Sequence, residues 1–135
     1  MLFVDEIVDK GLRHLSDLTD EEKPIYYLAY FEQVADMEGW DFFFIYNMDS
    51  YPLIKKLLIS SGDFNSLKIL KNYEDHFKAL DVTFSSKDID EFLLKAPESY
   101  YDSCPNWRKM FSAIYSERWR LASKYYGSIG VELKI

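Results

Sequence analysis

The sequence predicts one all-α domain, a bundle of about six to eight short and medium helices that spans residues 1–135. Apolar residues recur three and four positions apart along most of the chain, which is the spacing of one face of an α-helix. The 135 residues fit a single domain, and a hydrophobic content of 48% is enough for a packed core. No set of segments alternates apolar and polar residues as half-buried strands do.

The first two helices are marked by apolar stripes. The first stripe consists of Phe3, Ile7, Val8, Leu12 and Leu15, and its helix is interrupted or weakened near Gly11. The second helix has two candidate starts: Thr19 as N-cap with Glu22 in the capping-box position, or Lys23 with Pro24 in the first turn. Its stripe consists of Tyr27, Tyr30, Phe31, Val34 and Met37, and Gly39 is the expected stop.

The middle of the chain predicts three more helices. Residues 40–46 are expected to form a short, heavily buried helix, because helical neighbours on both sides disfavour a buried strand. After a turn at 47–50, Pro52 begins a helix that ends near Gly62. The next helix runs to Leu80, with Asp63 or Asn65 as its N-cap.

The last third predicts two helices and a tail. Ser85 begins a helix as a capping-box residue, and Ala96-Pro97 ends it. A last long helix then reaches Tyr126, with Ser103 or Cys104 at its cap and a proline just inside. Residues 129–135 alternate in character and are expected to form a short strand or an extended arm.

Composition limits the classes of function. A net charge of −7 and a pI near 4.8 argue against direct binding to nucleic acid, because phosphates would be repelled. Cys104 is the only cysteine, and the N-terminus lacks a secretory pattern, so a reducing cytoplasm is expected. No apolar run approaches the ~18 residues of a membrane span. An aromatic content of 18% predicts that some rings lie at a surface or an interface.

Charge is distributed unevenly along the chain. Residues 1–50 have a net charge of −9, residues 51–102 of −2 and residues 103–135 of +4. Either the acidic half packs beside the basic last helix and is partly neutralised, or the acids form an exposed negative face for a basic partner. The second interpretation makes seven acids the candidate binding residues: Glu21, Glu22, Glu32, Asp36, Glu38, Asp41 and Asp49.

Catalytic chemistry finds little support in the sequence. His14 and His76 have no neighbouring ligands at metal-binding spacing, so no metal site and no cofactor are expected. Cys104 has no assignable base or oxyanion site. Basic residues alternate with aromatic ones between residues 107 and 126, but at helical spacing such rings are more often core than a nucleic-acid surface. The protein is therefore not expected to be an enzyme.

One resemblance goes beyond composition. Residues 26–34 form an aromatic stretch, residues 38–47 contain a Phe-Phe pair, and a further helix leads to Gly62. Over about residues 18–84 the chain resembles a bacterial helical family that is named for a DNA-mimic protein and whose other members are largely of unknown function. The matching residues are Gly39, Trp40, Phe43, Phe44 and Asn47, whereas Glu38 departs from the family's usual Asn-Gly. The resemblance implies a helical fold and an acidic surface that imitates DNA phosphates.

These observations lead to two hypotheses. In the first, the chain is an acidic, cytoplasmic protein-binding module of a bacterium, a DNA mimic that sequesters a basic, DNA-binding protein. In the second, it is an immunity or antitoxin-like protein that inhibits one toxin through an aromatic interface. Neither involves a membrane or direct contact with nucleic acid. The oligomeric state stays open, with a dimer as one option.

Overall fold

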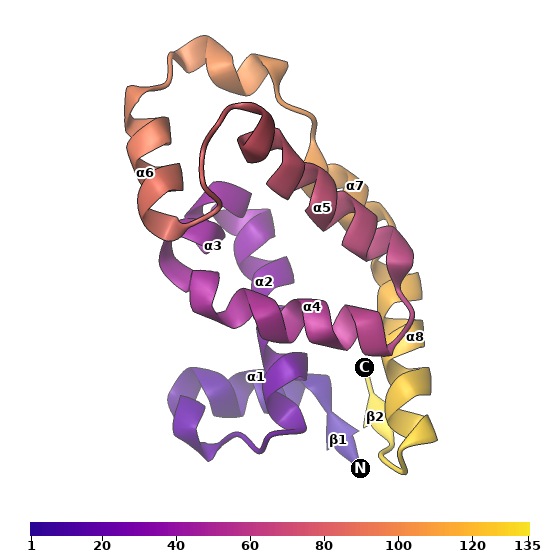
Figure 1. Ribbon diagram of the computed structural model, residues 1–135. Helices are drawn as coiled ribbons and strands as arrows, with labels where there is room; N and C mark the ends of the chain where they lie inside the picture. The colour runs from indigo at the N-terminus through magenta and orange to yellow at the C-terminus, as the bar shows by residue number, and fades with distance from the viewer.

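A computed structural model describes residues 1–135 and confirms the all-α prediction (Figure 1). The α-helices are α1 (Val4–Arg13), α2 (Glu22–Met37), α3 (Trp40–Asn47), α4 (Tyr51–Ser60), α5 (Phe64–Ala79), α6 (Ser86–Lys95), α7 (Trp107–Ala113) and α8 (Tyr115–Ser128). Three 3₁₀ segments connect them: Leu15–Asp17, Met48–Ser50 and Glu98–Ser103. None of the helices has the length and apolar character that crossing a membrane requires.

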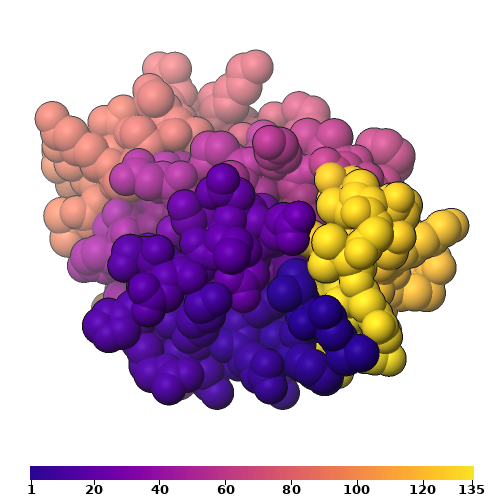
Figure 2. Space-filling view, turned by 90° about the horizontal axis from the view of Figure 1, so that it is seen from below, coloured from indigo at the N-terminus to yellow at the C-terminus, as the bar shows by residue number.

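The chain ends meet in a small parallel sheet. Strand β1 (Leu2–Phe3) pairs with β2 (Leu133–Lys134), so the option of a short strand in the tail is confirmed. The N-terminal segment therefore lies against the C-terminal tail, as the contact between the indigo and yellow surfaces in Figure 2 shows. Phe3, which the sequence placed in the first helix, belongs to β1 instead.

Helix α2 is the centre of the packing. It contacts α1, α3 and α4, while α3 also packs on α6, and α5 packs on α4 and α7. Phe31 of α2 is fully buried, and its ring meets those of Trp40, Phe43 and Phe111 at centroid distances of 5.2, 4.7 and 5.3 Å. The aromatic run at residues 40–46 is helical, as predicted, and supplies two of these rings.

Two of the predicted capping residues are confirmed by their hydrogen bonds, while α2 itself begins at Glu22, between its two candidate starts. The Thr19 N–H donates to Glu22 Oε1 at 2.9 Å, and the Glu22 N–H donates to Thr19 Oγ1 at 3.2 Å, which is a reciprocal capping box. Ser85 Oγ accepts from the Asp88 N–H at 3.2 Å. At the start of α5, Asp63 rather than Asn65 is the N-cap, and its side chain accepts from the Ser66 N–H.

Two predictions about helix continuity were wrong. Helix α1 is not interrupted at Gly11, which is helical and buried under the ring of Tyr26. The expected single helix from Ser103 or Cys104 to Tyr126 is two helices, α7 and α8, separated at Ile114. Asn106 caps α7 by accepting from the Lys109 N–H at 3.0 Å, so the helix starts after the proline instead of before it.

Candidate functional site

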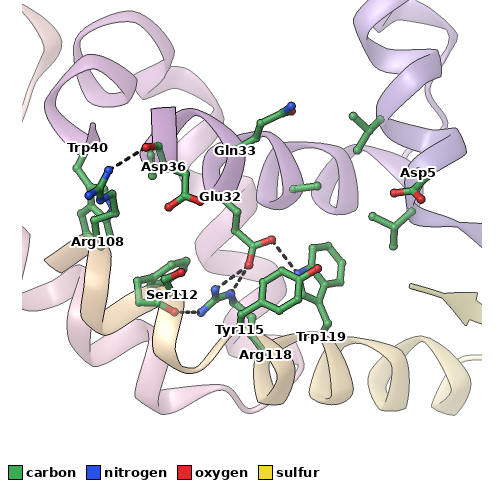
Figure 3. A pocket seen from close by; sticks show the side chains of 15 residues that line it. Asp5, Glu32, Gln33, Asp36, Trp40, Arg108, Ser112, Tyr115, Arg118 and Trp119 are labelled. Carbon is green, nitrogen blue, oxygen red and sulfur yellow. Dashed lines mark hydrogen bonds and ion pairs between the residues drawn. The ribbon is translucent and has the colours of Figure 1, made fainter. Parts of the chain in front are cut away.

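The structure has two cavities in which polar groups meet aromatic rings. The first, of about 350 Å³, lies between α1, α2, α7 and α8 (Figure 3). At its centre, Arg118 of α8 points toward Glu32 of α2. The guanidinium Nη2 lies 2.7 Å and Nε 2.8 Å from Glu32 Oε2, and Trp119 Nε1 donates to Oε1 at 2.8 Å.

The Nη1 atom of Arg118 has two further partners. Nη1 donates to Ser66 Oγ at 3.1 Å and to the carbonyl of Phe111 at 3.0 Å. Ser66 in turn donates to buried Asp63 at 2.6 Å, so the guanidinium is connected to two acids. It also lies 3.6 Å from the centroid of the Phe111 ring, a favourable position for a cation.

The Glu32–Arg118 pair of the first cavity is largely buried, and this burial sets its electrostatics. Loss of hydration raises the pKa of the Glu32 carboxyl above its ordinary value, although Arg118 and Trp119 favour its charged form. Arg118 is only 1% exposed; its Nε and Nη1 donate to groups of the chain itself, and its Nη2 is ion-paired with Glu32 although it makes no hydrogen bond. An incoming anion would have to break these bonds. The network therefore serves to join α2, α5, α7 and α8 rather than to bind a ligand.

The second cavity is larger than the first. It has a volume of about 810 Å³ and is bounded by α3, α6, the 3₁₀ segment Glu98–Ser103 and the start of α7. We name it the α3–α6 groove. Its charged lining consists of Glu38, Asp41, Asp90 and Arg108. Acids therefore exceed bases in the groove.

Asp41 is the most deeply placed carboxylate of the α3–α6 groove. The hydroxyl of fully buried Tyr73 donates to its Oδ1. No lysine, arginine or histidine nitrogen lies within 4.0 Å of its oxygens, since none of the ion pairs in the structure includes it. Burial raises the pKa of Asp41, with the Tyr73 hydrogen bond and the nearby His76 acting in the opposite direction.

A second hydrogen-bonded pair lies beside Asp41. His76 Nε2 and the Tyr100 hydroxyl are 2.6 Å apart, and Cys104 Sγ donates to the Tyr100 carbonyl at 3.4 Å. Burial lowers the pKa of His76 and raises that of Tyr100. The histidine is therefore favoured in its neutral form, which is the form that can share a proton with a phenol.

The rim of the α3–α6 groove is apolar and exposed. Phe42 and Tyr46 of α3 form an exposed ring pair with centroids 4.7 Å apart, and Tyr46 is 70% exposed. Across the groove, Leu94 of α6 is 78% exposed and Tyr101 is 56% exposed. Large apolar side chains left in water around one concavity mark a surface that a partner can cover.

The seven acids predicted from the sequence divide into two groups. Glu21, Asp36, Glu38 and Asp49 are exposed. The other three are turned inward: Glu22 pairs with Lys10 at 2.9 Å, Glu32 pairs with Arg118, and Asp41 is bonded to Tyr73. Only Glu38 and Asp41 line the α3–α6 groove, and Glu32 and Asp36 line the first cavity. The acids do not form a single shared site.

The sequence did not predict which residues line the groove together with Asp41. Tyr73, Asp90, Leu94 and Tyr101 lie on later segments than Asp41, and no local pattern connects them to it. The available signal was the excess of aromatic residues, which predicted an interface without locating it. Nowhere do three or more His, Cys, Asp or Glu side chains gather as a metal site requires.

Comparisons of the chain with protein-family models, with curated proteins and with solved structures found no match.

Proposed function

We propose that the protein is an acidic binding module that captures a basic segment of another protein in the α3–α6 groove. One observation carries the proposal: exposed apolar side chains surround a concavity whose acid Asp41 has no cation of this chain beside it. An apolar rim around a polar centre is the usual anatomy of a protein interface.

Charge complementarity supports a basic occupant. The groove contains three acids and one arginine, and Arg108 donates a 2.8 Å hydrogen bond to the Asp36 carbonyl. The whole chain has a net charge of −7, so its field attracts a cationic partner before contact. A neutral or acidic partner would leave the groove carboxylates desolvated and unpaired, which costs free energy.

Sequestration of a DNA-binding protein is the form of this function that the resemblance implies. Glu38 at the groove and exposed Asp36 and Asp49 nearby in the chain supply carboxylates that can compete with phosphates. Neutralisation by the basic last helix affects chiefly Glu32, through Arg118. Neutralisation therefore accounts for Glu32, and the exposed acids are the ones that we propose for a basic partner.

The test is capture from a bacterial lysate by the immobilised protein, with release by a salt gradient. We expect a basic protein that salt releases, because surface attraction between charges is screened within about 10 Å at 0.1 M salt. The double variant Phe42→Ala, Tyr46→Ala should lose the captured protein. Phe64→Ala is the matched control, since Phe64 is also an exposed ring but lies on α5 outside the groove.

Competition with duplex DNA then examines the DNA-mimic form. A captured protein that DNA displaces from the groove is a DNA-binding protein whose site the module occupies. Capture that is equally strong with the Phe42, Tyr46 double variant contradicts the proposal. So does recovery of acidic or neutral proteins alone without an effect of salt.

A second candidate function is supported by the exposed ring pair of the rim. An immunity or antitoxin-like protein that blocks one toxin through aromatic contacts would use Phe42 and Tyr46 as anchors. It predicts one tight partner that high salt does not release but that the Phe42, Tyr46 double variant loses. Salt dependence therefore separates the two candidates on the same surface.

A further inference from the structure

We infer that the Asp41 end of the α3–α6 groove is a pocket for the ammonium group of a lysine side chain from the partner, an inference that rests on the proposed function. The pocket combines one carboxylate with aromatic walls inside the cavity of about 810 Å³. Asp41, Trp40, Tyr101 and Trp107 border it, and Tyr73 holds the carboxylate from behind.

One oxygen of the Asp41 carboxylate accepts a hydrogen bond, and the other accepts none from the chain. Tyr73 donates to Oδ1, and no hydrogen bond of the chain reaches Oδ2. No basic nitrogen lies within 4.0 Å of Asp41, so no ion pair within the chain neutralises its negative charge. Burial raises the pKa of Asp41, and a bound cation would offset the free-energy cost of the desolvated charge.

Three aromatic side chains in the lining of the groove, Trp40, Tyr73 and Trp107, are buried and pack on one another. The Trp40 and Tyr73 rings have centroids 5.3 Å apart, and the Tyr73 and Trp107 rings 5.0 Å apart. The Asp41 charge is close enough to Tyr100 and Tyr101 to contribute to the raised pKa values of their hydroxyls. Aromatic rings around a carboxylate attract a cation through the ring faces as well as through the ion pair.

An ammonium group suits this arrangement better than a guanidinium does. Arginine binds a carboxylate best through a planar fork that uses both oxygens, and here Tyr73 already occupies Oδ1. Lysine presents a compact charge on an apolar stem, so its ammonium can meet Oδ2 while the stem lies along the rim. A metal ion is disfavoured because no third ligand gathers there.

The test uses n-butylammonium as a mimic of the lysine side chain. Its binding is followed by nuclear magnetic resonance at the indole N–H signals of Trp40 and Trp107, which border the pocket. We expect saturable shifts of both signals with n-butylammonium and at least about tenfold weaker binding of n-butylguanidinium and neutral n-butanol. Equal or tighter binding of either control compound overturns the inference.

Asp41→Asn is the decisive variant. Asparagine keeps the size of the side chain and an oxygen that accepts from Tyr73, but it removes the charge. It should weaken n-butylammonium binding at least about tenfold, whereas Asp17→Asn, the same charge change at an exposed position outside the groove, should have no effect. Unchanged affinity in Asp41→Asn overturns the pocket.

The two proposals fail in different ways. If the captured basic protein binds Asp41→Asn as tightly as the wild type and salt still releases it, the lysine pocket is wrong and the binding module stands. If n-butylammonium binds through Asp41 but the Phe42, Tyr46 double variant captures the same proteins as the wild type, the proposed function is wrong and the pocket stands.

Discussion

The Glu32–Arg118 pair shows at the scale of single residues how the acidic and basic parts of the chain are joined. We predict that Arg118→Met lowers the free energy of unfolding by about 3–5 kcal/mol, because it leaves the buried Glu32 carboxylate without its cation. It also removes one of the two donors to the Phe111 carbonyl, which keeps its hydrogen bond from the Ile114 N–H. Urea denaturation followed by tryptophan fluorescence measures the loss.

Arg120→Met is the matched control for this prediction. Arg120 lies two residues further along α8 and pairs with Glu117, but both side chains are about half exposed. Water already solvates that pair, so its removal should hardly move the urea midpoint. Equal losses in the two variants would contradict a special role for the buried pair.

Asp41 gives a prediction about pH. Its native pKa is raised, so its ionised form opposes folding at neutral pH, and this cost disappears as pH falls through the native pKa toward the unfolded value of about 3.9. Asp41→Asn should therefore be more stable than the wild type at pH 7. The difference should shrink on acidification and vanish below about pH 4.

Urea denaturation of both proteins across this pH range checks the prediction. His76, whose pKa is lowered, loses stability on acidification as it gains a proton, but it is present in both proteins and largely cancels in the difference. A difference that is constant with pH, or that grows on acidification, would contradict it. A buried carboxylate that lowers the stability of the fold and has no cation of the chain beside it is typical of a binding site.

Single residues also show which contacts a sequence can predict. Thr19 and Glu22 are three positions apart, so their capping box follows from local geometry, as does the Ser85 cap. Arg118 and Glu32 are 86 positions apart, and nothing local selects Glu32 from the other acids. The sequence therefore predicted a negative N-terminal half without distinguishing its buried members from its exposed ones.

At the scale of helices, the approach of α1 to α2 depends on Gly11. A Cβ at this position would overlap the ring of Tyr26, so Gly11→Ala should destabilise the protein by about 1–3 kcal/mol. Gly127 is also helical, in α8, but has open space around it. Gly127→Ala should therefore stabilise by up to about 1 kcal/mol through helix propensity.

Thermal or urea unfolding of the two variants provides the comparison. Opposite signs support close packing at Gly11, whereas stabilisation by both substitutions would show that the Tyr26 ring moves aside at little cost. The sequence marked Gly11 as a weak point of a helix, because a glycine reduces helix propensity. Its packing role depends on Tyr26 and was invisible locally.

Helix boundaries were predicted where side-chain caps and prolines mark them and missed where tertiary contacts decide them. The helix at residues 40–46 follows from its helical neighbours. The break at Ile114 has no local signal of that kind, and the structure shows that Arg118 compensates for it by donating to the Phe111 carbonyl. A side chain of α8 thus supplies a hydrogen-bond donor to a carbonyl in the last turn of α7.

At the scale of the whole molecule, the α3–α6 groove is assembled from distant parts of the chain. Its lining begins at Glu38 and ends at Arg108, with Tyr73 and Leu94 between them. The all-α class could be predicted because the apolar residues within each helix recur at helical spacing. The groove could not be predicted, because it depends on how α6 and the 3₁₀ segment Glu98–Ser103 pack against α3.

The closure of the two chain ends gives the last prediction. Leu133 of β2 is 6% exposed, whereas Ile135 is 61% exposed. Leu133→Ala should lower the free energy of unfolding by about 2–5 kcal/mol, the usual cost of emptying a buried leucine site, and Ile135→Ala should change it little. Urea denaturation measures both variants, and hydrogen exchange at the Leu2 amide, which donates to the Glu132 carbonyl at 2.7 Å, reports on the sheet.

The way in which Leu133→Ala loses stability is also informative. If the strands belong to the main core, as the burial of Leu133 with Val4 and Tyr126 indicates, circular dichroism and tryptophan fluorescence should show one coincident transition at lower urea. Faster exchange at Leu2 with an unchanged urea midpoint would contradict this and make the paired ends a local clasp that opens independently of the helices.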